Sequence, residues 1–186
     1  NLTTNGLVWS GGADLVGTGT LTTHGTTNIT GAGAGIGRNW TNDGTVNISG
    51  IGSAGFWGAN NLTWTNASGG IINLSGSDPA PIYTATNTGH SLVNTGQINK
   101  NPLSGTGQTI GDANLAIING GVGGGGINVH EGTLVIGGAL TLNPTSGVFV
   151  ANGATFSRPA GFINNGTLTG NGTLMVGMSA NGLLNQ

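Results

Sequence analysis

Few side chains in this 186-residue sequence could carry acid–base chemistry or bind a metal. They are the acids Asp14, Asp43, Asp78, Asp112 and Glu131 and the histidines His24, His90 and His130. Glycoside hydrolysis normally uses two carboxylates at a defined separation, and no two of these acids are close in the sequence. Folding could still bring Asp43 near another acid, so Asp43 is the first residue to test for catalysis.

Asp43 also has a simpler interpretation, because it lies in an Asn-Asp-Gly segment that is typical of turns. His24 and Glu131 occupy the same position, directly before a glycine, in similar phrases of the sequence. Three different polar residues at one turn position indicate tolerance rather than chemistry. We therefore predict no catalytic residue and no enzyme.

No metal or cofactor site is predicted either. The histidines lack the short spacing of a zinc site, and the chain has no cysteine. A formal G-x-G-x-x-G occurs at Gly121, Gly123 and Gly126, but it lies in a run of glycines with no helix after it to receive a phosphate. The segment GAGAGIG, from Gly31, fails that spacing.

Aromatic side chains are the other candidates for ligand contact. Trp40 and Trp64 begin two similar phrases, NWTNDGTVNISG and TWTNASGGIINLSG, and are 24 residues apart. Packed inside they would fill the core, whereas exposed in a row they would offer flat faces to sugar rings. Core packing is favoured because a chain without disulfides needs large buried areas. Glycan contact by Trp40, Trp64 and Tyr83 is the alternative.

The scarcity of charged residues argues against several classes of partner. Only eight residues are charged, three basic and five acidic, which is 4% of the chain against a usual ~25%. Phosphate binding needs clustered Lys and Arg, and the three basic residues are far apart, so we expect no nucleic acid partner. No apolar run approaches the ~20 residues of a membrane span, so we expect no membrane insertion of this segment.

Repetition indicates the elements that position these residues. A pattern G-x-φ-N-φ, in which φ is apolar, begins at Gly25, Gly44 and Gly70, and a shorter copy begins at Gly96, at spacings of 19, 26 and 26 residues. Weaker copies follow, and they begin at Gly132, Gly153 and Gly166. Short alternating strands separated by Gly and Asn turns at this period are typical of a β-solenoid. We predict an all-β protein of about eight coils of ~19–26 residues, forming one domain over residues 1–186.

Two local predictions follow from this repeat. The asparagines three residues after each glycine, Asn28, Asn47, Asn73 and Asn99, should form a column in which amides hydrogen-bond from coil to coil; a structural role for it is favoured over ligand binding. The least regular segment, Ser77 to His90, is predicted to project as a loop, where binding residues often lie.

The phrases FINNGTLTGNGTLMVG and INVHEGTLVIGGALTL resemble the passenger regions of bacterial autotransporters and of two-partner-secreted, filamentous-haemagglutinin-like adhesins. The resemblance covers almost the whole chain. It implies a right-handed single-stranded parallel β-helix, located extracellularly or on a bacterial cell surface, that serves adhesion or matrix building. The chain begins at Asn1 without Met or a signal peptide, so we expect a portion of such a protein or a separate filament subunit.

The expected function is therefore structural or adhesive, with coils stacking end to end into filaments. Its expected partners are neighbouring coils or further copies of the chain, and host or matrix glycans. One alternative is a protein that binds or cleaves polysaccharides. Another is a protein that binds ice or another crystal surface, for which the pairs Thr26 with Asn28 and Thr45 with Asn47 could form a flat face, although Ile71 and Gln97 interrupt it.

Overall fold

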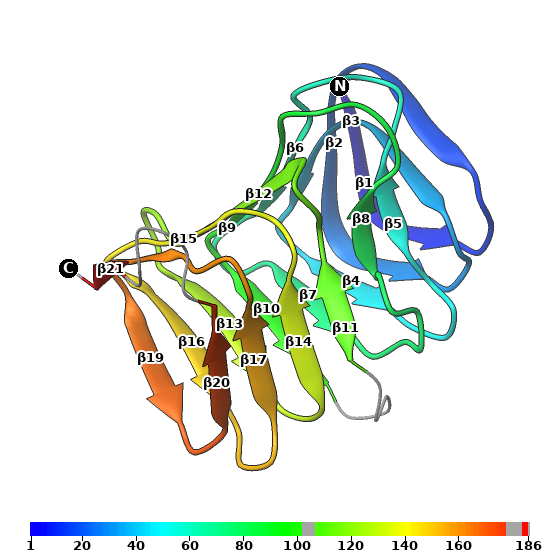
Figure 1. The fold of residues 1–186 in the computed structure, drawn as a ribbon. Coiled ribbons are helices and arrows are strands. Elements are labelled where there is room, and N and C mark those ends of the chain that lie inside the picture. Colours follow the sequence, from blue (N-terminus) through cyan, green and yellow to red (C-terminus); the bar gives the residue numbers. More distant parts are fainter. Residues whose placement is uncertain (102–106, 178–183, 186) are drawn as a thin grey trace.

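The chain forms a stack of parallel β-strands. The computed structural model describes residues 1–101, 107–177 and 184–185, and these residues form 21 strands and no helix. The strands are β1 (Leu2–Trp9), β2 (Asp14–Ile29), β3 (Ala34–Asn42), β4 (Thr45–Ile48), β5 (Ala54–Phe56), β6 (Thr63–Asn66), β7 (Ile71–Leu74), β8 (Ile82–Thr84), β9 (His90–Asn94), β10 (Gln97–Lys100), β11 (Gln108–Ile110), β12 (Leu115–Asn119), β13 (Gly125–Val129), β14 (Thr133–Ile136), β15 (Leu140–Leu142), β16 (Ser146–Val150), β17 (Thr155–Arg158), β18 (Ile163–Asn164), β19 (Thr167–Gly170), β20 (Thr173–Val176) and β21 (Leu184–Asn185). Figure 1 shows them stacked in chain order from the blue end to the red end.

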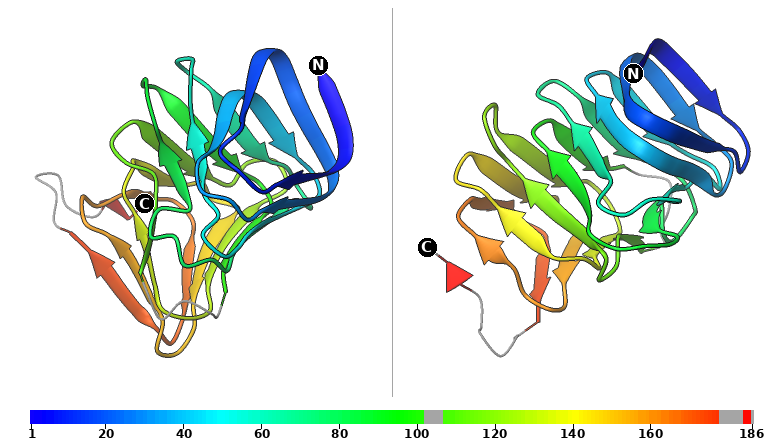
Figure 2. Two further views of the ribbon diagram at one scale, coloured as in Figure 1. Left: turned by 90° about the vertical axis from the view of Figure 1, so that its right-hand side faces the viewer. Right: turned by 90° about the horizontal axis from the view of Figure 1, so that it is seen from above.

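Each coil contributes one strand to each of three faces, because from β4 onward every strand pairs with the strand three positions later. The first face consists of β4, β7, β10, β13, β16 and β19, preceded by the second halves of β1 and β2. The second face consists of β5, β8, β11, β14, β17 and β20, preceded by the first halves of β2 and β3. The third consists of β6, β9, β12, β15, β18 and β21, preceded by the first half of β1, the middle of β2 and the second half of β3. The two views of Figure 2 show the chain winding around a common axis, with the three faces running along it.

The first face shows that strand register is held while loop length varies. Its eight strands align Val8, Asn28, Asn47, Asn73, Asn99, Asn128, Phe149 and Thr169 in one column. Asn99 and Asn128 are 29 residues apart, so one coil is longer than the expected ~26. The chain is thus a β-solenoid of about eight coils. Long connections cost little because loop-closure entropy rises slowly with length.

The weaker copies of the repeat do not all lie on that face. Thr133, after Gly132, pairs with Thr155, and both belong to the second face. The strand after Gly166, by contrast, does belong to the first face. The same glycine-led phrase therefore begins strands on two faces of the coil, which the spacing of the glycines alone did not reveal.

Alternation along the strands fills the interior. In β4 and β7 the side chains of Val46, Ile48, Ile72 and Leu74 point inward and are fully buried, while their neighbours are partly exposed. Burying each such side chain contributes roughly 1.5–3 kcal/mol. Similar residues from every coil form one continuous core along the stack.

The segment from Ser77 to His90 is not a projecting loop. Its centre is strand β8, which pairs with β5 and β11 inside the stack. Ile82 is fully buried, and His90 is buried at the start of β9. Residues 85–89 are exposed, yet the backbone N–H groups of Ala85 and Thr86 donate to the carbonyl of Phe56 in the preceding coil. The prediction was wrong because a three-residue strand between prolines and asparagines is too short for its alternation to be recognised.

Candidate functional site

The four asparagines of the predicted column hydrogen-bond in series on the first face. Each side-chain Nδ2 donates to the Oδ1 of the preceding coil, at 3.0 Å from Asn47 to Asn28, from Asn73 to Asn47 and from Asn99 to Asn73. Asn128 extends the series at 2.9 Å. These amides, the outer ladder, are partly exposed. They link five coils.

A second ladder, which the sequence analysis missed, lies inside the turn between the third and first faces. Asn42 donates to Asn66 at 2.8 Å, Asn66 to Asn94 at 2.7 Å, and Asn94 to Asn119 at 2.6 Å. These four side chains, the inner ladder, are fully buried. The donors point toward the C-terminus, which is opposite to the outer ladder.

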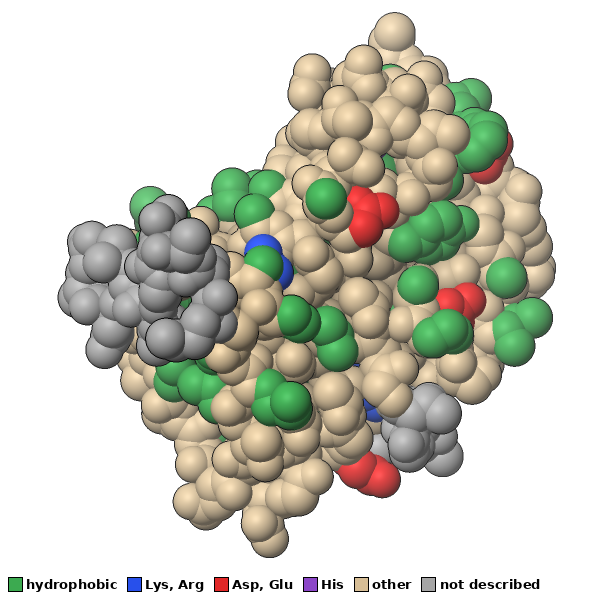
Figure 3. All heavy atoms as spheres, viewed as in Figure 1, with side chains coloured by type: hydrophobic (Ala, Val, Ile, Leu, Met, Phe, Trp, Pro, Cys, Tyr) green, Lys and Arg blue, Asp and Glu red, His purple; other side chains and the backbone are tan. Residues whose placement is uncertain are grey.

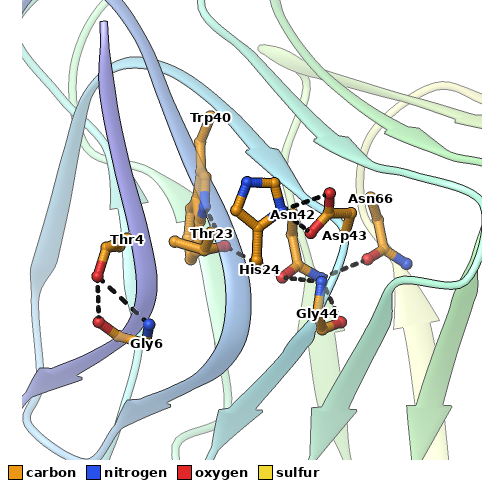
Figure 4. A network of polar contacts seen from close by, with 9 residues as sticks. All are labelled: Thr4, Gly6, Thr23, His24, Trp40, Asn42, Asp43, Gly44 and Asn66. Carbon is orange, nitrogen blue, oxygen red and sulfur yellow. Dashed lines mark hydrogen bonds and ion pairs between the residues drawn. The ribbon is translucent and has the colours of Figure 1, made fainter.

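The inner ladder begins at Thr23 and also holds the turn backbone. Trp40 Nε1 donates to Thr23 Oγ1 at 3.0 Å, and that hydroxyl donates to Asn42 Oδ1 at 3.1 Å. Figure 4 shows Asn42 between Thr23 and Asn66, with its amide also bonded to Gly44. Because buried backbone carbonyls must be satisfied, these amides replace the water that a turn would otherwise need.

Trp40 and Trp64 do not contact glycans, because they are 1% and 0% exposed. Strand register places them on adjacent coils of the third face. Their rings stack at a centroid distance of 4.3 Å with planes 8° apart. The core interpretation of these two residues is therefore correct. Trp57, which follows β5, is 43% exposed.

Asp43 is brought next to His24, not next to another acid. The two residues lie in equivalent turns of adjacent coils, with Nδ1 of His24 2.7 Å from a carboxylate oxygen of Asp43 (Figure 4). Both side chains are well exposed, at 46% and 39%. An exposed ion pair of this kind typically contributes 0–1 kcal/mol. The arrangement is that of a surface pair joining two turns.

The remaining acids have separate surroundings. Asp112 accepts hydrogen bonds from Thr84 Oγ1 and from the backbone of Asn114. Burial lowers the pKa of Lys100, and the nearby carboxylate of Glu131 offsets part of this effect. Burial is the main cause that raises the pKa of the Tyr83 hydroxyl. The nearby carboxylates of Asp78 and Asp14 raise it further.

Tyr83 lies beside a hollow of about 400 Å³ on the second face, lined by Ala32, Gly33, Ser53, Asp78, Ala80 and Tyr83. Gly55, paired with Tyr83, lies directly under its ring, because a Cβ at residue 55 would be 2.5 Å from Tyr83 Cζ. Figure 3 shows acidic and hydrophobic side chains close together in the region of β5 and β8, on an otherwise largely uncharged face. Of the three predicted glycan contacts, only Tyr83 is on the surface.

In the part of the chain that the structure describes, no group of three or more His, Cys, Asp or Glu side chains could hold a metal ion. Within the same residues, no helix is long and apolar enough to cross a membrane.

Comparison with known proteins adds no relative: no family model, no curated protein and no solved structure matches the chain.

Proposed function

We propose that the chain is an extracellular structural or adhesive β-solenoid of a bacterial surface protein or fibre. The observation that carries the proposal is the unbroken parallel stack, which the two asparagine ladders link from coil to coil. Such a stack is stiff along its axis, since from the second coil onward successive coils are bonded through three faces. A stiff, nearly uncharged rod suits a spacer that presents binding surfaces away from a cell.

The ends of the stack support growth by further stacking. Among the described residues, β1 pairs only with β2, so its other edge is unpaired. At the far end, Leu174 and Met175 of β20 are 42% and 57% exposed. Exposed strand edges recruit further strands, and eight charged residues in 186 oppose close association very little. Coils would thus continue the stack either within a longer polypeptide or between copies.

Electron microscopy and sedimentation of the purified chain test intermolecular stacking. We expect rods whose length increases with protein concentration. The double variant Thr3→Lys/Val8→Lys, which places charge on the exposed edge strand β1, should stop this growth. The matched variant Thr45→Lys/Thr109→Lys places the same charge on outward positions within the stack, outside both ladders, and should not. Monodisperse particles of unchanged length at every concentration would contradict stacking between copies.

Binding of an ordered crystal surface such as ice is a second candidate, and one observation favours it. On the third face, Thr3, Thr22, Thr41 and Thr65 are aligned in consecutive coils without interruption, and all four are at least partly exposed. The column continues with Val93, so it stays β-branched. If this face binds ice, thermal hysteresis should be measurable and should be lost on Thr41→Lys, whereas Thr45→Lys on the first face should preserve it.

A further inference from the structure

The segment GAGAGIG forms the floor of a site on the second face. Gly35 pairs with both Asp14 and Gly55, and Gly55 pairs with Tyr83, so four coils contribute to one outward column. A Cβ at Gly35 would collide with the carboxylate of Asp14, and a Cβ at Gly55 would collide with the ring of Tyr83. The two side chains therefore lie over the glycines and extend toward each other from opposite sides. Glycines here leave the space that both side chains occupy.

Hydrogen-bonding groups remain unused in and beside the hollow: Asp78 and Tyr83 line it, and Asp14 lies beside it, over Gly35. Within the described residues, neither the Tyr83 hydroxyl nor the Asp14 carboxylate has a hydrogen-bond partner. Asp78 accepts one bond from the backbone of Ala80 at 2.8 Å through Oδ1, which leaves Oδ2 available. Burial, Asp78 and Asp14 raise the pKa of Tyr83 in that order, so the phenol stays neutral and can donate. Among the described residues, no Lys or Arg lines the hollow.

Trp57 extends the surface along the same strand. It follows the buried Phe56, so alternation directs it outward, on the side of Gly55. Its backbone N–H donates to Ile36 at 2.9 Å, which keeps this residue in the stack. Trp57 lies two residues beyond Gly55, the residue under the Tyr83 ring, so an extended ligand that passes over Tyr83 can reach its indole.

We propose that this surface binds a neutral oligosaccharide, with one hexopyranose unit in the hollow beside Tyr83. The hydroxyls of the sugar donate to Asp78 in the hollow and to Asp14 beside it, and they accept from the Tyr83 hydroxyl, while the Tyr83 ring contacts its apolar C–H face. The two carboxylates repel uronic acids and other anionic sugars. The inference deepens the proposed adhesive function by naming its ligand class, and it rests on that function.

The only tyrosine of the chain makes the test direct. Protein labelled with ¹³C at the tyrosine ε position gives one ring signal, which is followed by NMR during titration with the neutral hexasaccharides cellohexaose and maltohexaose. We expect a saturable shift with at least one of them, at about 10 mM sugar or less. Hexagalacturonate, which is anionic, should give no saturable shift. A glucosamine hexamer, which is cationic, should not be the one sugar that gives a shift.

Matched acid variants locate the site. Asp14→Asn should weaken binding about tenfold, because a bond to a charged acceptor is lost. Asp43→Asn removes one negative charge on another turn and should leave affinity unchanged. Tyr83→Phe keeps the ring over Gly55 and should also weaken binding when measured by calorimetry. Since these side chains are at the surface, unfolding midpoints close to that of the parent chain verify the fold.

Several outcomes would overturn the proposal. They are the absence of a shift with either neutral hexasaccharide, equal binding of hexagalacturonate, binding of the glucosamine hexamer alone, or equal effects of Asp14→Asn and Asp43→Asn. Stacking of the chain is measured separately by microscopy. Rods that form but bind no neutral sugar would thus reject this site and preserve the structural role, whereas sugar binding without rods would reject stacking between copies and preserve the site.

Discussion

Trp40 and Trp64 stack face to face inside the solenoid, with ring centroids 4.3 Å apart and planes 8° from parallel. On the other side of Trp40, the ring of Trp9 lies at a tilt, with its centroid 6.4 Å away. Large rings thus fill the N-terminal core, where the corresponding position of the next coil is the smaller Leu92. The relationship depends on coil length, because only an insertion that stays outside the strand can keep two indoles in register.

We expect Trp64→Ala to lower the free energy of unfolding by about 3–5 kcal/mol, because it leaves a large cavity between Trp40 and Leu92. Trp64→Phe should cost less than half as much, since an aromatic ring remains against Trp40. It also removes the buried indole N–H of Trp64, which has no hydrogen-bond partner in the structure. Denaturant unfolding measures both values. Equal losses for the two variants would show that a phenyl ring packed against Trp40 contributes nothing to stability.

The two ladders should differ in their contribution to stability. Asn66→Ala leaves the carbonyls of Gly70 and Gln97 without their side-chain donor in a buried turn, so we expect a loss of about 3 kcal/mol or more. Asn73→Ala removes a partly exposed amide, for which water can substitute, so about 1 kcal/mol is expected. Chemical denaturation of both variants gives the comparison. A larger loss for Asn73→Ala would mean that the outer ladder holds the stack.

The sequence predicted the solenoid because glycine-led strands recur with their apolar positions in phase. It also placed Asn28, Asn47, Asn73 and Asn99 in one column, since all lie three residues after a glycine. The inner ladder had a weaker signal, because its distance to the glycine at the start of the next first-face strand varies: it is two residues for Asn42 and Asn94, four for Asn66 and six for Asn119. An asparagine next to a turn can point either way, and only the backbone path decides.

The hollow at Tyr83 could not be predicted from the sequence for a different reason. Its residues come from several coils, and their alignment depends on the lengths of the intervening loops. The segment GAGAGIG fails the spacing of a phosphate-binding loop, whereas its Gly35 makes room for Asp14, as Gly55 on the next coil does for Tyr83. A glycine pattern indicates close approach but does not identify the side chain that approaches.

The turn glycines should be intolerant of a side chain where coils approach closely. A Cβ at Gly44 would collide with the backbone carbonyls of His24 and Gly25 on the preceding coil. Gly44→Ala must therefore separate two coils, and we expect a loss of about 2–4 kcal/mol in the free energy of unfolding. Gly11→Ala, where a Cβ would meet nothing within 4 Å, is the matched control and should change stability by less than about 0.5 kcal/mol. Thermal unfolding of the pair decides the matter, and a neutral Gly44→Ala would show that coil spacing adjusts freely.

Lys100 is the charged residue of an otherwise apolar inward column, between Leu74 and Val129 in the adjacent coils. Its side chain is fully buried, and its Nζ donates to the backbone carbonyl of Asn101 at 3.3 Å. Burial lowers the pKa of this amine, and Glu131 offsets part of that effect. In the interval between the lowered pKa and the ordinary value near 10.4, the unfolded chain binds more protons than the folded chain. Stability associated with Lys100 therefore rises with pH across this interval.

Lys100→Met fills the same column without a charge and should abolish this rise. We expect the free energy of unfolding of the parent chain to increase relative to that of Lys100→Met as the pH goes from 7 toward 10, as measured by urea unfolding at fixed ionic strength. Arg38→Met removes a basic side chain whose Nη2 donates to the exposed backbone of Thr18, and its stability should follow the pH course of the parent chain. If the difference between the parent chain and Lys100→Met stayed constant over this range, the amine would have the same pKa in the folded and unfolded states, and the core would have to admit water at Lys100.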